Sequence, residues 1–408
     1  MKFITNPQLK ELDREVAEFY KLNVRFLNSL ENIYGKEVYK SRLSELLTKS
    51  DSINGDSEFD KLLLKNIHSN LSLNDLVIDY ITDYDFSLSP EKFIDAIAGE
   101  GVWNYLEDNF KNAPWEQRWL INERTQKLNQ FRVNPSVDET KDATKKWLPI
   151  IKNDVLNYGR SKDILPKDFD INLFLLFDGN NSYWDSETKS IYLNYCTFEH
   201  FLDKEKVIVN PIWAYKTAFH EILGHAAHQI NSCNLPLSLR FSSEIGSITP
   251  TKSVTEGVAK NKDKECFAYL RENLDNIGIN EEAIQIVEVQ SDLGNRSELE
   301  SLYASLIKDK ELREKGFDSY EYILDLTKNK IIADIIKNKF NHNFINKIVS
   351  IGHALGALHY NKMQEKITQE FGEKFLMENQ KRIGSATLKG VWSWEVYPDA
   401  VSYFLRKD

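Results

Sequence analysis

The chain has 408 residues and a formal net charge of −10, from 62 acidic and 52 basic side chains. This acidic balance argues against a nucleic-acid partner, and the lack of any run of 18 apolar residues argues against a membrane span or membrane partner. Because the N-terminus does not read as a signal peptide, we expect a cytoplasmic protein, and its 41% hydrophobic and 12% aromatic content provides for a sizeable core.

The first part of the chain, residues 1–165, reads as helices separated by short polar breaks, because apolar residues recur there at helical spacing. One break is the polar stretch 50–57. Ser89 and Pro90 are typical of an N-cap followed by the first helical residue. We therefore predict a helical N-terminal region over 1–165, continuous with a catalytic metal-binding region over 166–408.

Strand patterns appear late in the sequence. The apolar runs 171–177 and 189–195 are separated by a cluster of turn residues at 178–182. We predict that these runs form a small antiparallel sheet just before a helix that Asn210 and Pro211 begin. The expected fold class is mainly α, a multi-helix protein with a small antiparallel sheet beside the active site.

That helix carries the most chemically distinctive stretch of the chain, in which His220, Glu221 and His225 lie among apolar residues. Neutral imidazoles are good zinc donors, and a catalytic zinc takes three protein ligands and leaves a fourth position for water. A glutamate beside the first histidine can take a proton from that water. The pattern predicts one Zn²⁺ per chain, with Glu221 as general base.

The spacing of the two histidines requires a distortion of the helix. Five residues of regular α-helix would turn His225 about 140° away from His220. A π-bulge absorbs one residue and returns both rings to one side. Gly224, just before His225, suits such a distortion. We predict a helix defect between Glu221 and His225.

The segment His220-Glu221-Ile222-Leu223-Gly224-His225 resembles the HExxGH signature of the dipeptidyl peptidase III family, within the gluzincin group of zinc peptidases. In that family both histidines bind zinc and the glutamate is the base. Thr255-Glu256-Gly257-Val258-Ala259 is similar to the Glu-Gly-x-Ala segment that supplies the third ligand in several gluzincins, including a bacterial family of helical metallopeptidases. The resemblance covers residues 220–270. It implies a peptide substrate and an edge strand that pairs with the backbone of that substrate.

Three glutamates compete for the place of third ligand. On a helix over 254–274, Glu256 lies on the apolar side and Glu265 on the charged side. Glu244 follows the second histidine at a spacing found in the aminopeptidase type of gluzincin. We rank Glu256 first, Glu265 second and Glu244 third, and expect Asp263 to orient a ligand histidine.

The C-terminal part offers donors for the oxyanion of the reaction. In related helical peptidases, C-terminal histidine and tyrosine residues have this role, which His353, His359 and Tyr360 resemble. Plain packing is the alternative for these three, and Tyr397 and Tyr403 are the next candidates.

Cysteine usage fits an intracellular protein. Cys196, Cys233 and Cys266 are widely spaced and odd in number, which predicts free thiols rather than disulfides. We expect Cys266 to pack as a small apolar residue.

Together these patterns predict a zinc-dependent peptide hydrolase. Three alternatives stay open at this point: His225 and His228 as the ligand pair, a zinc hydrolase of non-peptide amides or esters, and a noncatalytic helical protein with a structural metal site.

Overall fold

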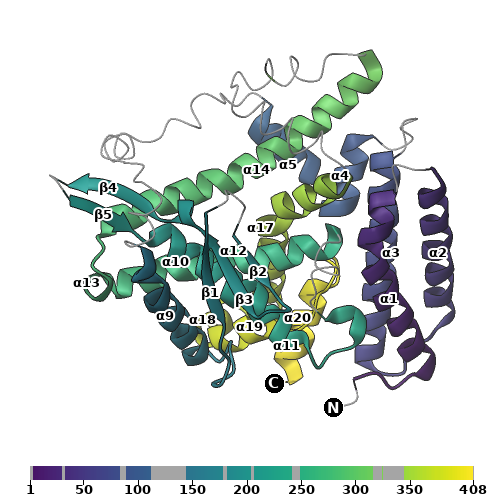
Figure 1. Ribbon diagram of the computed structural model, residues 1–408. Coiled ribbons are helices and arrows are strands. Elements are labelled where there is room, and N and C mark those ends of the chain that lie inside the picture. The colour runs from purple at the N-terminus through teal and green to yellow at the C-terminus, as the bar shows by residue number, and fades with distance from the viewer. Residues whose placement is uncertain are drawn as a thin grey trace. The chain divides into compact units, whose positions relative to one another are not determined.

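The structure is a computed structural model of the chain, and it is mainly α-helical with a small three-stranded mixed sheet (Figure 1). It describes residues 3–29, 33–82, 89–111, 144–177, 182–203, 206–240, 249–315, 324 and 344–407. The predicted class, mainly α, is confirmed. Within these residues no helix combines the length and the apolar character that crossing a bilayer requires.

The chain forms two compact units, each made of several segments. The first contains residues 1–117, 232–257 and 295–408, and the second contains residues 118–231 and 258–294. Helices α12 (Thr249–Glu272) and α14 (Glu281–Lys315) each pass from one unit into the other along the chain.

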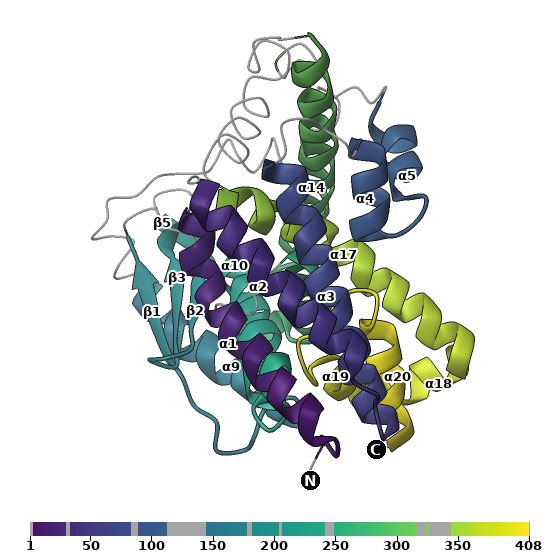
Figure 2. The same cartoon turned by 90° about the vertical axis from the view of Figure 1, so that its right-hand side faces the viewer.

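The first unit is built from helices, and α1 to α3 pack side by side within it (Figure 1). Near the C-terminus α17 contacts α18 and α20 (Figure 2). The elements of the first unit, besides parts of α12 and α14, are α1 (Pro7–Ser29), α2 (Ile33–Ser52), α3 (Glu58–Thr82), α4 (Pro90–Ala98), α5 (Val102–Phe110), η3 (Leu237–Leu239), α17 (Phe344–Phe371), α18 (Glu373–Glu378), α19 (Gln380–Thr387) and α20 (Tyr397–Lys407).

Local sequence accounts for the start of α4. The Ser89 hydroxyl accepts a hydrogen bond from the Lys92 backbone N–H at 3.4 Å, and Pro90 is the first helical residue, so the predicted N-cap is confirmed. The apolar face of α4 then joins a buried cluster with α3, α5, α14 and α17. The members of this cluster include Val77, Phe93, Ile97, Trp103, Leu106, Leu302 and Leu355.

The second unit combines helices with short strands. Its elements, besides parts of α12 and α14, are α9 (Trp147–Ser161), β1 (Asn172–Leu176), β2 (Tyr183–Asp185), β3 (Ser190–Asn194), η1 (Tyr195–Thr197), β4 (Glu199–Asp203), β5 (Lys206–Asn210), α10 (Ile212–Ala218), η2 (Phe219–Ala226), α11 (Ala227–Ser232) and α13 (Leu274–Ile277).

The three-stranded sheet corrects the prediction of an antiparallel pair. Its order is β1-β3-β2, and the two strands predicted from sequence, β1 and β3, are parallel to each other (Figure 2). The reason is β2, a three-residue strand that follows the predicted turn cluster 178–182 and pairs antiparallel with β3. The hairpin of β4 and β5 was also not predicted.

An aromatic row fixes the register of this sheet. The rings of Phe174 and Tyr192 stack at 5.4 Å between centroids, and those of Tyr183 and Tyr192 at 4.9 Å. Cross-strand aromatic pairs of this kind stabilise a sheet. The opposite face, which includes Ile191 and Leu193, is buried, so the sheet has one packed side and one open side.

Candidate metal centre

A π-helix carries the two predicted histidine ligands. Residues Phe219–Ala226 form η2 with π-helical hydrogen bonding, between the α-helices α10 and α11. The predicted defect is confirmed, and it covers the whole motif rather than one bulge. Because a π-helix has more residues per turn, His220 and His225 face the same side, with ring centroids 5.1 Å apart and planes at 78°.

Gly224 has a different role from the one predicted. Its backbone is not among the positive-φ residues, so the π-helix does not need its conformational freedom. A Cβ atom at this position would instead lie 2.6 Å from the Ala259 Cβ atom and 2.7 Å from the Ala259 Cα atom of α12. Gly224 therefore allows η2 to lie directly against α12.

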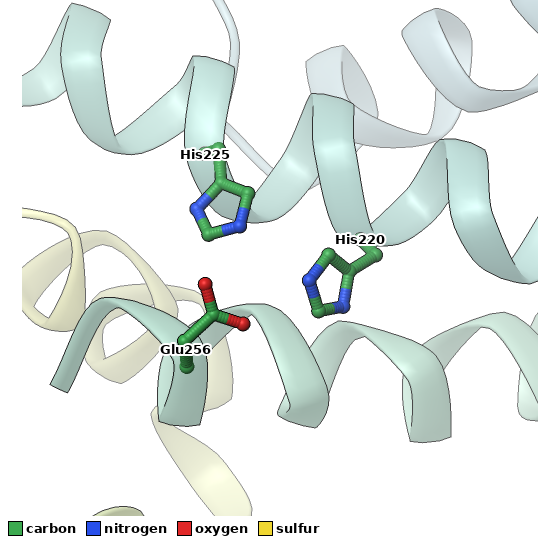
Figure 3. Close-up of side chains that lie close together, drawn as sticks. All are labelled: His220, His225 and Glu256. Atoms are coloured by element: carbon green, nitrogen blue, oxygen red, sulfur yellow. The ribbon is translucent and has the colours of Figure 1, made fainter. Parts of the chain in front are cut away.

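Helix α12 supplies the third residue of the group (Figure 3). One ligand atom each of His220, His225 and Glu256 lie within 4.8 Å of one another. Figure 3 shows both imidazole rings and the carboxylate pointing toward one another. Among the described residues, neither His228 nor Glu265 joins this group, and Glu244 lies outside the described residues.

The donor set fits a divalent metal ion. Two imidazoles and one carboxylate are the ligands of many catalytic zinc sites, and tetrahedral zinc places its donors about 3.4 Å apart. The observed spacing therefore needs only small side-chain movements. The group can hold a metal ion with an open fourth position.

Asp263 fixes the orientation of His220. The Nδ1 atom of His220 is 3.3 Å from Asp263 Oδ1, and Lys216 Nζ is 2.9 Å from Asp263 Oδ2. When Nδ1 donates to the carboxylate, the Nε2 lone pair is available for a metal. Burial alone would raise the pKa of Asp263, but the charges and hydrogen bonds of Lys216 and His220 outweigh burial and hold this pKa below its ordinary value.

Glu256 has two polar partners of its own. Lys252 Nζ, one helical turn earlier on α12, is 2.5 Å from Glu256 Oε1. His353 Nδ1 on α17 is 3.1 Å from Glu256 Oε2. The Glu256 side chain is only 1% exposed, and these contacts offset the cost of burying its charge. Of the three predicted oxyanion donors, His353 therefore contacts the metal group itself.

For the other predicted catalytic residues, the structure shows burial and packing contacts. Glu221 is buried within η2, beside His220 in sequence. His359 is also buried: its Nδ1 atom lies 2.7 Å from Ser253 Oγ, and its ring stacks on Trp394. Tyr360 is buried on α17. The roles of these residues in the reaction stay predictions, and the packing of His359 favours a structural role.

The two further tyrosine candidates lie in packed surroundings. The Tyr397 hydroxyl donates to the Thr387 carbonyl at 3.2 Å. The Tyr403 ring packs against Phe59 and Phe404. Neither contact connects these tyrosines with His220, His225 or Glu256.

All three cysteines are free thiols, as predicted. Cys266 is fully buried on α12, which confirms its expected packing. Burial raises the pKa of its thiol well above the ordinary value, so the thiol is unreactive in the folded protein.

The functional residues that sequence reasoning missed are the two lysines. Lys216 precedes His220 by four residues, and Lys252 precedes Glu256 by four. Residues four apart on a helix are neighbours, so a search for charges one turn before each ligand would have found both. Glu265 was predicted on the charged side of α12, and its partner there is a buried lysine, Lys262, whose Nζ atom lies 2.6 Å from Glu265 Oε1.

Fold and site together define a mainly helical protein with a candidate centre of two histidines and one glutamate. No protein-family model and no curated protein matches this sequence. The case for a function therefore rests on the residues of the centre and their contacts.

Proposed function

We propose that this protein is a zinc-dependent peptide hydrolase. The observation that carries the proposal is the convergence of His220, His225 and Glu256 on one point, with Glu221 next to the first ligand in the same π-helix. A zinc ion held there would polarise a substrate carbonyl and lower the pKa of water to near neutrality.

In this proposal the side chains in and around the centre have separate roles in the reaction. Glu221 takes the proton of the attacking water and passes it to the leaving amine. Asp263 keeps His220 in the tautomer whose Nε2 is unprotonated and can bind a metal. His353, next to Glu256, is the best placed of the predicted donors to stabilise the developing oxyanion.

The sheet supports a peptide as the substrate. Strand β2 is an edge strand of the described sheet, and it contacts η2. The Trp184 indole N–H also donates to Gln229 Oε1 in α11, at 2.8 Å. An edge strand offers unpaired backbone groups to an extended peptide, which binds as an additional strand. We propose that β2 binds the substrate backbone in this way.

The test is Glu221→Gln, with Glu265→Gln as the matched control. Both changes replace a carboxylate by an amide, but Glu265 pairs with Lys262 and lies outside the metal group. We expect Glu221→Gln to retain its zinc and to lose about 10²- to 10⁴-fold in kcat on a peptide library. Glu265→Gln should retain both zinc and turnover.

Two results would replace the proposal with another function. Turnover of small esters or amides without any peptide cleavage would indicate a non-peptide hydrolase. One zinc ion per chain with no turnover on any of these substrates would indicate a structural metal site.

A further inference from the structure

Lys252 already occupies one oxygen of the predicted carboxylate ligand. Its Nζ atom is 2.5 Å from Glu256 Oε1, and the two residues are one turn apart on α12. A buried carboxylate requires a compensating charge. The lysine therefore supplies, from within the chain, the positive charge that a metal ion would bring to Glu256.

The packing of α17 against α12 holds this pair in position. A Cβ atom on Gly352 would lie 2.8 Å from the Lys252 Cβ and Cγ atoms. A Cβ atom on Gly356 would lie 3.0 Å from the Glu256 Cβ atom. Two glycines four residues apart on α17 thus fit against two charged residues four apart on α12. The stem of Lys252 is confined, while its side chain stays 20% exposed.

We propose that Lys252 competes with the metal ion for Glu256 and thereby sets the metal affinity of the centre. The inference rests on the metal centre of the proposed function. A divalent cation and an ammonium group on one carboxylate repel each other, so binding of the metal to Glu256 favours departure of Nζ from Oε1. The partial exposure of the side chain gives Nζ a path to water, since a lysine stem can stay packed while its charged end is solvated.

The direction in which zinc affinity changes on removal of Lys252 distinguishes a competitor from a residue that supports a metal ligand. A side chain that only orients a ligand raises metal affinity, and its removal weakens binding about 10- to 100-fold. Asp263 has such a role toward His220. A competitor acts in the opposite direction, so its removal strengthens binding.

The experiment is a Zn²⁺ titration of metal-free protein against a chelating dye. We expect Lys252→Met and Lys252→Gln to lower the Kd for zinc about 10- to 100-fold, because the competing ion pair is lost. Lys252→Arg keeps the charge and should keep the wild-type Kd. Lys262→Met removes a buried lysine of the same helix whose partner, Glu265, lies outside the group of His220, His225 and Glu256, and should leave the Kd unchanged.

Stability measurements keep the test valid if Lys252→Met folds poorly. Metal-free Lys252→Met should have a lower thermal midpoint than wild type, because Glu256 loses its ammonium partner. Addition of zinc should raise this midpoint by more than it raises that of wild type. Lys252→Gln removes the charge but keeps a shorter polar side chain, and it serves as the second variant. An unchanged or higher Kd in both folded variants overturns the inference.

This test separates the inference from the proposed activity, because hydrolysis is not measured. If wild type binds one zinc ion and both variants bind no more tightly, the competition is wrong and the metal centre stands. If wild type binds no zinc, the metal centre itself is wrong. A protein that binds zinc with the expected order of affinities but cleaves no peptide would leave the inference intact.

Discussion

Changing Asp263 to asparagine tests how strongly the centre depends on a residue that does not touch the metal. Asp263 is 5% exposed, 3.3 Å from His220 Nδ1 and 2.9 Å from Lys216 Nζ. Asparagine keeps a carbonyl oxygen that can accept from Nδ1, but it removes the negative charge. The change therefore isolates the electrostatic part of the interaction.

Two magnitudes follow from these contacts. Loss of a carboxylate that orients a ligand histidine typically weakens metal binding about 10- to 100-fold, which is roughly 1.4 to 2.8 kcal/mol. Breaking a buried ion pair from one side costs about 3 kcal/mol. Because the Lys216 side chain is 16% exposed and can partly reach water, we expect about 2 kcal/mol of lost unfolding free energy in the metal-free protein.

The assays are zinc competition with a chelating dye and urea unfolding of the metal-free protein. Asp154→Asn is the matched control, because Asp154 accepts a hydrogen bond from the Tyr215 hydroxyl at 2.6 Å and does not contact a ligand histidine. The control should lose stability but change its zinc Kd by no more than about twofold. That change is well below the one expected when a carboxylate that orients a ligand histidine is lost. An unchanged Kd in Asp263→Asn would refute the claim that Asp263 orients His220.

Three further predictions concern separate features of the molecule. Gly224→Ala should weaken zinc binding at least tenfold and cost about 1–3 kcal/mol of unfolding free energy, because the added methyl group would lie 2.6 Å from Ala259 Cβ; chelator competition and urea unfolding measure both. Burial lowers the pKa of His359 to about 3, so below about pH 6 the unfolded chain binds a proton that the folded chain does not. Metal-free wild type should lose about 1.4 kcal/mol of unfolding free energy per pH unit from this group as the pH falls, and His359→Asn should have a shallower slope in urea unfolding at pH 4 to 7; equal slopes would contradict the assignment. A thiol reagent should modify two cysteines per folded chain and all three in urea, because only Cys266 is buried; rapid modification of Cys266 in the folded protein would count against its packing.

The residues of the candidate metal centre were predictable because their chemistry is local. Five residues apart, His220 and His225 do not share a face of an α-helix, so binding of one metal ion by both predicted a distortion, and the structure has a π-helix there. Glu256 could be preferred over Glu265 because helical periodicity placed it on the apolar side of α12, where it is buried.

The contacts around these residues were less predictable, because they depend on how distant segments pack. Gly224 appeared to serve the helix distortion, whereas its contact with Ala259 depends on how η2 packs against α12. The contact of His353 with Glu256 joins residues nearly 100 positions apart. Only the two lysines had a local signal, since each lies one turn before a ligand.

The sheet shows a different limit. The apolar patterns of β1 and β3 predicted strands correctly, but no pattern within a strand specifies the direction of its partner. The three-residue strand β2 is too short for an alternating pattern to appear. Its insertion beside β3 left β1 to pair on the other side, in parallel.

The most direct test of the central claim is the zinc content of protein purified without added metal. Elemental analysis should find one zinc ion per wild-type chain and almost none in His220→Ala, with far-UV circular dichroism showing that the variant is folded. Wild-type protein without stoichiometric metal, or equal metal in His220→Ala, would contradict a centre formed by His220, His225 and Glu256.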